Sequence, residues 1–502
     1  MSKMSKLLCA TIDGFDAITV EIESTFTKGL PSFSIVGLGN SAIQESKDRI
    51  KSSLLTNDFK FPPKRITINL SPSEIMKKGS HLDCAMALLI ALNGKNIDFK
   101  DFYVFGELGL DGKLKDTASI FIIILSLAKE KKITNVLIPK ESIEKISTIP
   151  NLNIFAVDNL NEAIEFFEQN NKESKKIVNK KFEYKYLEIA NKKYYYEDNS
   201  FDLDFLDVKG QTVAKRAALI SAAGNHNILF EGNPGCGKSM ITKRIQYIMP
   251  PMSLEEILDK AKLDSLELKE PSFRPHRALI SPHHSSTKAS ILGGTKIGEI
   301  ALCNNGILFF DELPHFSKSI IEALREPLED HCILVSRVNT KIKYETKFLF
   351  ISAMNPCPCG NLLSKTKECR CSQLEVQRYK SRISDPFLDR IDLYVVMNEV
   401  NSSDKADVSS AILYQKVLNA FYLQKSRGQE ELNGKLNEKD IQKYCKLNDD
   451  CKLILNKAID NFSLTFRSIN KILKVSRTIA DIENSKDIQK NHLFEALSYR
   501  RR

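Results

Sequence analysis

The stretch 232–239 reads Gly-Asn-Pro-Gly-Cys-Gly-Lys-Ser and matches the pattern G-x-x-x-x-G-K-S/T of a phosphate-binding loop. The residues before it, 227–231, are apolar and strand-like, and 240–249 carry apolar residues at helical spacing. Glycines let backbone N–H groups close around phosphate oxygens, and a helix start adds positive dipole. A chance glycine-rich turn would not need this strand and helix, so the stretch predicts a nucleoside triphosphate site in an α/β fold.

Each position of this loop has an expected role. Lys238 is expected to reach the β- and γ-phosphates of ATP, and Ser239 is expected to hold Mg²⁺. The other members are expected to surround the phosphates with their backbone: Gly232, Asn233, Pro234, Gly235, Cys236 and Gly237.

Two further apolar stretches end in polar residues. Residues 306–312 read Gly-Ile-Leu-Phe-Phe-Asp-Glu, a predicted buried strand followed by two acids. An ATPase of this class needs one carboxylate near Mg²⁺, expected at Asp311, and often a second that polarises water, expected at Glu312. The stretch 348–355 ends at Asn355, which is expected to orient the attacking water; the alternative is a simple strand cap.

The length of 502 residues predicts about three domains, because one core of that size is unusual. The longest apolar run, 118–128, is shorter than the ~20 residues that a membrane span needs. With no signal peptide visible, we expect a cytoplasmic protein whose cysteines are reduced. The net charge of +10 is compatible with a polyanionic partner, although a lysine-rich composition alone can produce it.

The N-terminal part, residues 1–168, alternates predicted strands and helices. Its segments 77–83 and 106–112 resemble the proteolytic domain of Lon protease. That chemistry needs a serine on a helix and an activating lysine. The helix instead opens with Asp83, and Ser80 precedes it, so we expect a packing or ring-forming module rather than a protease. Residues 169–200 lack sustained periodicity and are predicted to be a linker, unless tyrosines 194–196 dock on a neighbouring domain.

Residues 201–400 are predicted to form the nucleotide-binding core, and 401–502 a helical lid. Together with 385–392, the three landmarks above resemble the AAA+ class, and more closely the magnesium-chelatase-like ATPases of the ComM/YifB type. The resemblance extends over essentially the whole chain. The segments that carry it are 282–285, 293–294, 298–300, 311–314, 323–329, 355–360 and 463–481. Asn233 and Cys236 depart from the Pro and Thr usual in that family's loop, at positions where the backbone does the binding.

The resemblance implies two arginine roles. Arg390 aligns with the arginine finger that acts on the neighbouring subunit's ATP, and Arg378 and Arg382 compete for that role. Arg467 aligns with the lid arginine that senses the γ-phosphate. A surface salt bridge is the alternative for each.

Residues 335–344 are predicted to form a hairpin with its tip at 339–340. Its basic residues Arg337, Lys341 and Lys343 are expected to face the channel of a ring and to contact DNA phosphates. A solvated charged hairpin is the alternative. A second insertion is expected at 274–294.

Four cysteines, Cys357, Cys359, Cys369 and Cys371, form two C-x-C pairs. Four thiolates can close a tetrahedral Zn²⁺ site, although C-x-C is tighter than the usual C-x-x-C. Reduced free thiols are the alternative, and His283 with His284 are interpreted as loop residues.

The family resemblance implies an ATPase that assembles as a homo-oligomeric ring, expected to be a hexamer, and moves on DNA in branch migration or helicase action, during recombination or natural transformation. Two alternatives remain open. One is a chelatase-type ATPase that drives metal insertion into a porphyrin with partner subunits. The other is a regulator of a Lon-like protease.

Overall fold

A computed structural model describes residues 5–14, 16–168, 175–198, 201–294, 296–336, 341–400 and 404–501. The chain divides into two compact units, one formed by 1–183 with 258–273 and the other by 184–257 with 274–502. Helix α8 (Leu254–Leu266) begins in the second unit and ends in the first.

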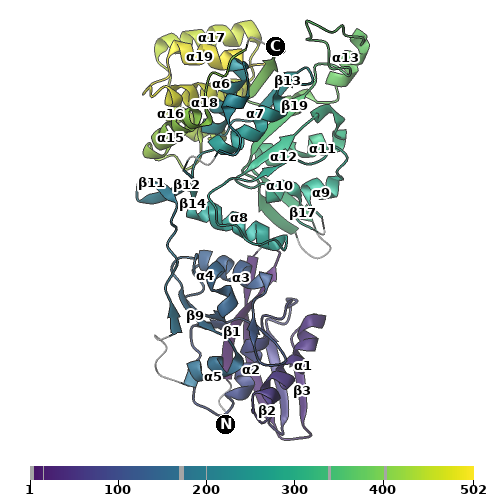
Figure 1. Cartoon of the computed structure of the whole chain (residues 1–502), viewed down its shortest axis with the longest axis vertical. Coiled ribbons are helices and arrows are strands. Elements are labelled where there is room, and N and C mark those ends of the chain that lie inside the picture. Colours follow the sequence, from purple (N-terminus) through teal and green to yellow (C-terminus); the bar gives the residue numbers. More distant parts are fainter. Residues whose placement is uncertain are drawn as a thin grey trace. The chain divides into compact units, whose positions relative to one another are not determined.

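An eight-stranded mixed sheet forms the first unit, in the order β10-β9-β8-β5-β1-β2-β4-β3. Strands β1, β2 and β4 pair antiparallel, whereas β8 pairs parallel with both β5 and β9 (Figure 1). The strands of this unit are β1 (Ser5–Asp13), β2 (Asp16–Thr27), β3 (Ser32–Val36), β4 (Arg65–Ser71), β5 (Phe102–Val104), β6 (Glu107–Leu108), β7 (Leu114–Lys115), β8 (Asn135–Pro139), β9 (Asn153–Val157) and β10 (Lys176–Ile177). Its helices are α1 (Ser41–Thr56), α2 (Asp83–Ala91), α3 (Ala118–Lys129), α4 (Ile143–Ile146) and α5 (Leu160–Glu168).

The start of helix α2 shows what replaces a nucleophilic serine. The carboxylate of Asp83 is fully buried and accepts from Arg49 Nε at 2.7 Å and from the Ser46 hydroxyl. Burial raises the pKa of Asp83, and the bonds from Arg49 and Ser46 act in the opposite direction. The hydroxyl of Ser80 donates to Glu107, and the ammonium of Lys77 donates to a backbone carbonyl. The bonds of Asp83 to Arg49 and Ser46 therefore join helices α1 and α2.

Residues 258–273 were predicted to belong to the nucleotide-binding core. They pack within the first unit instead. The Phe273 ring meets Phe121 of α3 edge-on, with 5.6 Å between ring centroids. Lys145 pairs with Glu270 at 3.6 Å. Burial of apolar surface decides where this segment lies, and the local sequence pattern does not report it.

A five-stranded parallel sheet is the centre of the second unit, in the order β15-β16-β19-β13-β20. Its strands are β15 (Leu279–Ile280), β16 (Ile307–Phe310), β19 (Leu349–Met354), β13 (Ile228–Gly232) and β20 (Leu393–Met397). Residues of β13, β16 and β19 are almost all buried, as expected for a sheet covered by helices on both faces. The helices of this core are α6 (Thr212–Gly224), α7 (Lys238–Ile245), α9 (Lys288–Leu292), α10 (Glu299–Leu302), α11 (Lys318–Ala323), α12 (Arg325–Glu329), α13 (Gln373–Lys380) and α14 (Asp385–Leu388).

Two smaller β elements belong to this unit. Strands β11 (Lys185–Ile189) and β12 (Lys192–Tyr196) form a hairpin within the segment predicted to be a linker, and β14 (Met252–Ser253) extends it. Tyr194 of this hairpin packs edge-on against Phe421, with 5.1 Å between ring centroids. The second hairpin joins β17 (Cys332–Ser336) to β18 (Lys341–Glu345), as the sequence predicts.

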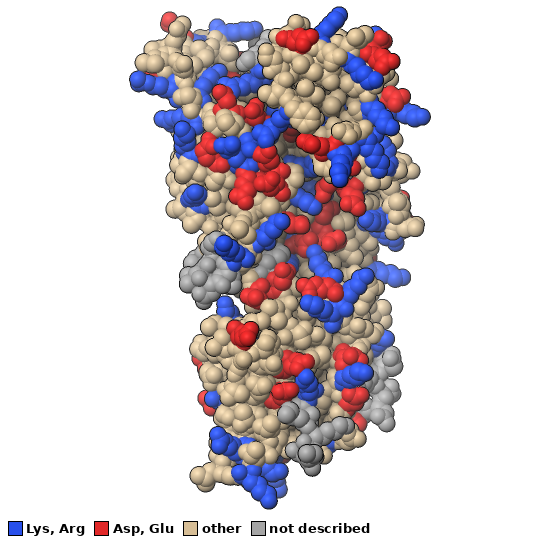
Figure 2. Space-filling model, turned by 180° about the vertical axis from the view of Figure 1, so that it is seen from behind, with Lys and Arg blue, Asp and Glu red and all other residues tan. Residues whose placement is uncertain are grey.

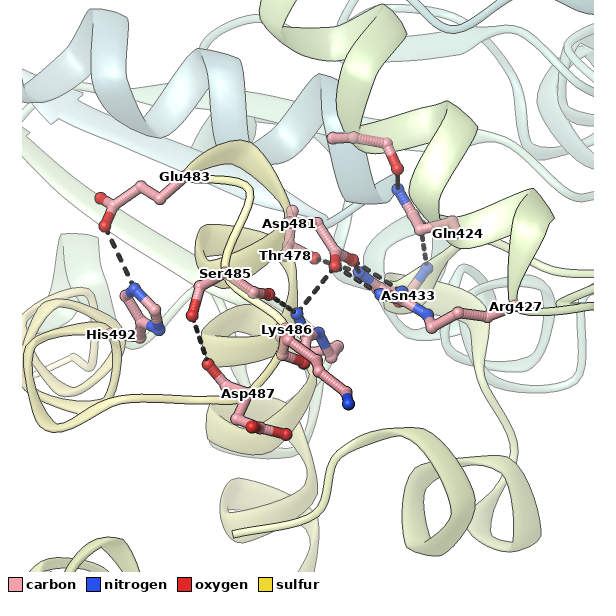
Figure 3. Close-up of polar contacts among 12 residues, drawn as sticks. Gln424, Arg427, Asn433, Thr478, Asp481, Glu483, Ser485, Lys486, Asp487 and His492 are labelled. Carbon is pink, nitrogen blue, oxygen red and sulfur yellow. Dashed lines mark hydrogen bonds and ion pairs between the residues drawn. The ribbon is translucent and has the colours of Figure 1, made fainter. Parts of the chain in front are cut away.

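Five helices occupy the C-terminal part (Figure 1, green to yellow): α15 (Ser410–Ser426), α16 (Glu438–Tyr444), α17 (Asp449–Phe462), α18 (Phe466–Ile482) and α19 (Lys490–Ser498). Their buried polar centre is Asp481, which accepts from Arg427, from Arg477 at 2.9 Å and from Asn433 at 2.8 Å (Figure 3). This network joins α15, the loop before α16, and α18. Within the described part of the chain, every helix is too short or too polar to cross a bilayer.

Candidate nucleotide-binding site

The predicted phosphate-binding loop joins β13 to α7 at the carboxyl edge of the parallel sheet. Gly237, at the position before α7, has φ +97°, a backbone conformation that residues with a side chain rarely adopt. A side chain at Gly232 would meet the sulfur of Cys236 at 2.7 Å. The glycines are therefore required by the loop's geometry, and they leave the first N–H groups of α7 directed into the loop.

The ammonium group of Lys238 lies inside this loop. It donates to the carbonyl oxygens of Gly232 at 2.5 Å and Asn233 at 3.1 Å, and to the amide oxygen of Asn355 at 3.0 Å. Burial lowers the pKa of Lys238, while nearby Cys236, Asp311 and Glu312 act in the opposite direction. The three acceptors hold one cation between the ends of β13 and β19.

Ser239 and Asp311 meet where the sequence predicts a magnesium site. The Ser239 hydroxyl donates to Asp311 Oδ2 at 2.9 Å, and the N–H of Glu312 donates to Asp311 Oδ1 at 3.0 Å. A hydroxyl and a carboxylate are oxygen ligands of the kind that Mg²⁺ prefers, usually beside the phosphates of a nucleotide. The donor set therefore fits this ion. Glu312 has φ +51° and an exposed side chain that follows the strand end.

The two arginines predicted to act on nucleotide lie together and bind the same carboxylate. Arg390 and Arg467 both donate to the carboxylate of Glu329, at the end of α12. Burial lowers the pKa of Arg390, whereas the negative charge of Glu329 raises it. The positive charges of Arg467 and Arg325 act with burial and lower it further. One carboxylate thus binds two guanidinium groups, while Arg325 pairs with Glu322 at 3.0 Å. The competing Arg378 and Arg382 are exposed, and Arg382 donates to the Pro314 carbonyl at 3.3 Å.

The hairpin β17–β18 presents its lysines on one face. Lys341 and Lys343 are exposed, whereas Ile342 and Tyr344 between and after them are buried. Residues two apart on a strand share a face, so both ammonium groups project from the solvent side. Arg337 and the tip at 339–340 lie outside the described residues.

The four cysteines come together. Cys357, Cys359, Cys369 and Cys371 have their sulfur atoms all within 4.8 Å of one another. Three of the sulfur pairs are separated by 3.4, 3.6 and 3.7 Å. A tetrahedron of Zn–S bonds near 2.3 Å has edges of about 3.8 Å, so this donor set fits a zinc ion. Backbone N–H groups of Asn361 and Arg370 lower the pKa of Cys359 to about 6, which favours its thiolate.

Two residues near the loop, Glu399 and Glu231, were not predicted as site residues. Glu399, just after β20, accepts from Asn233 at 3.1 Å. Glu231, in the predicted apolar strand, pairs with Lys380 at 2.8 Å while almost fully buried. An acid inside an apolar strand was the signal that could have identified Glu231, because buried carboxylates are normally paired. Nothing in the local sequence marks Glu399.

Models of one protein family match three successive parts of the chain. The model described as magnesium chelatase, subunit ChlI, matches residues 204–405. The model of subunit ChlI of Mg-chelatase matches 22–142, and the model of the ChlI C-terminal part matches 407–500.

Individual relatives cover nearly the whole chain. The competence protein ComM of Haemophilus influenzae is 36% identical, over 97% of this chain and 95% of ComM. The protein YifB of Salmonella typhimurium is 35% identical with the same coverage. The chain is more distantly similar to the maternal DNA replication licensing factor mcm6 of Xenopus tropicalis. The identity is 19%, over 55% of this chain and 32% of mcm6.

Proposed function

The chain belongs to the magnesium-chelatase-like ATPases of the ComM/YifB type, and from this premise we propose that it is a ring-forming AAA+ ATPase that couples ATP hydrolysis to movement on DNA. The observation that carries the proposal is the meeting of Lys238, Ser239, Asp311 and Asn355 at one edge of the parallel sheet. In this proposal 1–168 is a Lon-protease-like domain, 201–400 the AAA+ core except for 258–273, which packs within the first unit, and 401–502 the lid; the predicted linker, 169–200, contains the hairpin β11–β12.

Each residue of the nucleotide site has a separate role in hydrolysis. Lys238 binds the β- and γ-phosphates in place of the carbonyls that it now contacts. Ser239 and Asp311 hold Mg²⁺, which neutralises charge on the phosphates. Glu312 polarises the attacking water and Asn355 orients it. Because Asn355 shares a hydrogen bond with Lys238, it is close enough to sense the γ-phosphate.

The arginines require a second copy of the chain. Arg390 and Arg467 share the single charge of Glu329, whereas Arg325 pairs with Glu322 at 3.0 Å. A neighbouring subunit's γ-phosphate would supply the missing negative charge. The proposed homo-oligomer, a hexameric ring, places Arg390 as the finger that acts in trans, and Arg467 beside it.

DNA contact is assigned to the hairpin rather than to overall charge. On the face shown in Figure 2, basic and acidic side chains are interspersed, so the net charge of +10 does not define a binding surface there. The exposed lysines of β18 do share one face, and three residues separate this strand from β19, which ends before Asn355. Lysine contacts to phosphate are independent of sequence, which suits a motor that moves along DNA. The similarity to ComM, a competence protein, supports a role in competence.

The cysteine set is proposed to hold one structural Zn²⁺. Four thiolates leave no open coordination position, so this ion would organise the loop and take no part in hydrolysis.

A second candidate is a chelatase-type ATPase, which is favoured by the description of all three matching family models as parts of ChlI. The rate of ATP hydrolysis with and without DNA separates the two. We expect duplex, single-stranded or branched DNA to stimulate hydrolysis several-fold. If none of these binds or stimulates, the DNA motor is wrong and the chelatase ATPase is preferred.

A further inference from the structure

The loop that carries the four cysteines, residues 357–371 (the cysteine loop), lies directly against the phosphate-binding loop. Gly360 follows Cys359, and a Cβ atom built on it would meet Cγ and Cδ of Pro234 at 2.7 Å. Its φ of +79° also favours glycine. The backbone of the cysteine loop therefore approaches Pro234 more closely than any residue with a side chain allows.

A carboxylate joins the two loops a second time. Oε1 of Glu399 accepts from the side-chain amide of Asn233 at 3.1 Å and from the hydroxyl of Ser364. Its Oε2 accepts from the N–H of Lys365 at 3.1 Å. Ser364 in turn accepts from the N–H of Lys367 at 3.0 Å. Glu399 thus connects a buried residue of the phosphate-binding loop to the middle of the cysteine loop.

A third connection follows the cysteine loop. Helix α13 begins directly after it, and Lys380 at the end of that helix pairs with Glu231 at 2.8 Å. Glu231 lies in β13, immediately before Gly232. Asn355, which accepts from Lys238, comes two residues before Cys357. The segment 355–380 therefore contacts the phosphate-binding loop at Asn355 and Gly360 and, at its other end, the strand that leads into that loop.

Apart from the cysteines and the hydrogen bonds around Glu399 and Ser364, little holds residues 355–372 in shape. Residues 355–372 form neither helix nor strand. Of the apolar side chains there, Leu362 and Leu363 are 41% and 42% exposed and contribute little core. A metal held by four thiolates closes such a loop and supplies folding free energy that the loop lacks.

We propose that a metal ion on Cys357, Cys359, Cys369 and Cys371 clamps the phosphate-binding loop through Gly360 and Glu399, so that metal occupancy sets the affinity for nucleotide. This inference rests on the nucleotide and zinc sites of the proposed function, and not on DNA. Glu399 acts as a positioning residue, because it orients Asn233 and reaches no phosphate itself. Loss or oxidation of the thiolates would thus weaken ATP binding before hydrolysis begins.

The test is equilibrium binding of a fluorescent ATP analogue to the full chain without DNA. Zinc content is measured in parallel. Removing zinc with a chelator under reducing conditions is expected to weaken binding roughly tenfold, and adding Zn²⁺ back is expected to restore it.

Two variants separate clamping from general unfolding. Gly360→Ala keeps all four cysteines but disturbs the contact with Pro234, and Glu399→Ala removes the bridge. Both are expected to retain zinc and to raise the Kd for the analogue roughly three- to tenfold. Gly428→Ala is the matched control for the first, because Gly428 has φ +78° with no atom within 4 Å of its Cβ position. Glu368→Ala, at an exposed carboxylate of the same loop, is the control for the second.

Each alternative outcome contradicts a different statement. If the parent chain binds the analogue equally well with and without zinc, or if Gly360→Ala and Glu399→Ala bind as their controls do, the clamp is wrong. If the purified chain takes up no zinc, the clamp and the zinc site are both wrong, while the ATPase assignment stands. If the zinc-loaded parent binds no analogue, the nucleotide site itself is wrong. Where zinc removal unfolds the chain, the two zinc-retaining variants decide.

Discussion

The ammonium of Lys238 donates to the amide oxygen of Asn355 at 3.0 Å, so the phosphate-binding loop and the end of β19 share one cation. Lys238 begins α7 after the loop that follows β13, and Asn355 follows β19; these two parallel strands are neighbours and end at the same edge of the sheet. A phosphate bound to Lys238 therefore lies within reach of Asn355. In the proposed function, this relationship places the group that binds phosphate beside the group that senses it.

Hydrolysis should depend on Lys238 and Glu312 in different ways. Lys238→Ala is expected to abolish ATP binding, because it removes the cation for the phosphates. Glu312→Gln is expected to bind ATP with near-parental affinity and to lower kcat by roughly 10² or more, because the water loses its base. Binding is measured by fluorescence and hydrolysis by phosphate release. Lys243→Ala, on the exposed face of α7, is the control. Parental turnover by Glu312→Gln would contradict its role.

Arg390 should act on the neighbouring subunit. Arg390→Ala is expected to leave ATP binding intact and to lower kcat by ~10³, the scale of an arginine finger. Mixing Arg390→Ala with Lys238→Ala subunits should restore part of the activity, because each intact site then meets an intact finger. Arg378→Ala and Arg382→Ala are measured beside it. Loss of hydrolysis with Arg378→Ala or Arg382→Ala, but not with Arg390→Ala, would move the finger to that residue.

The hairpin should account for much of the DNA affinity. Replacing Arg337, Lys341 and Lys343 by alanine is expected to leave basal hydrolysis intact and to remove its stimulation by DNA. The slope of log K against log salt should decrease in size by about 2 to 3, one unit per lost phosphate contact. Lys416→Ala with Lys439→Ala, at exposed positions in the C-terminal helices, serves as the control. An unchanged salt slope in the triple variant would exclude the hairpin from DNA contact.

The purified chain should contain about one zinc ion. Cys359→Ser is expected to lower the zinc content, because one of the four thiolates is lost, and Cys332→Ser, outside the cluster, is expected to leave it unchanged. Elemental analysis and titration of reactive thiols check this. A chain without zinc and with four titratable thiols at these positions would identify them as ordinary reduced cysteines.

The Asp481 network should be needed for stability of the C-terminal helices (Figure 3). Asp481→Ala leaves the guanidinium groups of Arg427 and Arg477 without their carboxylate, and Arg477 is only 4% exposed. Breaking a buried pair in this way costs about 3 kcal/mol or more. We expect Tm to fall by ~5 °C or more, measured by circular dichroism. Asp450→Ala, an exposed acid of α17, should change Tm little.

The sequence by itself determined the local elements and the nucleotide loop. Helix α1 (Ser41–Thr56) lies in the part predicted to alternate strands and helices, and the side chain of Asn40 accepts from the N–H of Ile43 as its cap. Apolar spacing and capping residues act over a few positions, so they can be interpreted without knowing the fold. The loop 232–239 can also be identified from the local sequence, because the conformation of its own backbone requires its glycines.

The hairpin at 185–196 has no signal in the local sequence that would have predicted it. Its turn residues Ala190 and Asn191 both have positive φ, but the usual signal for such a turn is Asn-Gly or Asp-Gly. Ala at this position gives no sequence signal. Packing of Tyr194 on Phe421 helps to hold the hairpin, and that contact joins residues far apart in the chain.

Only the tertiary structure decided which distant groups meet. It brings Gly360 onto Pro234, places Glu399 between two loops, and gives Arg390 and Arg467 the same carboxylate on Glu329. These pairs depend on which faces of strands and helices are buried together. That choice is made by the whole core at once, because burial of apolar surface has no direction: a local apolar pattern marks the face that is buried but not the face that it packs against.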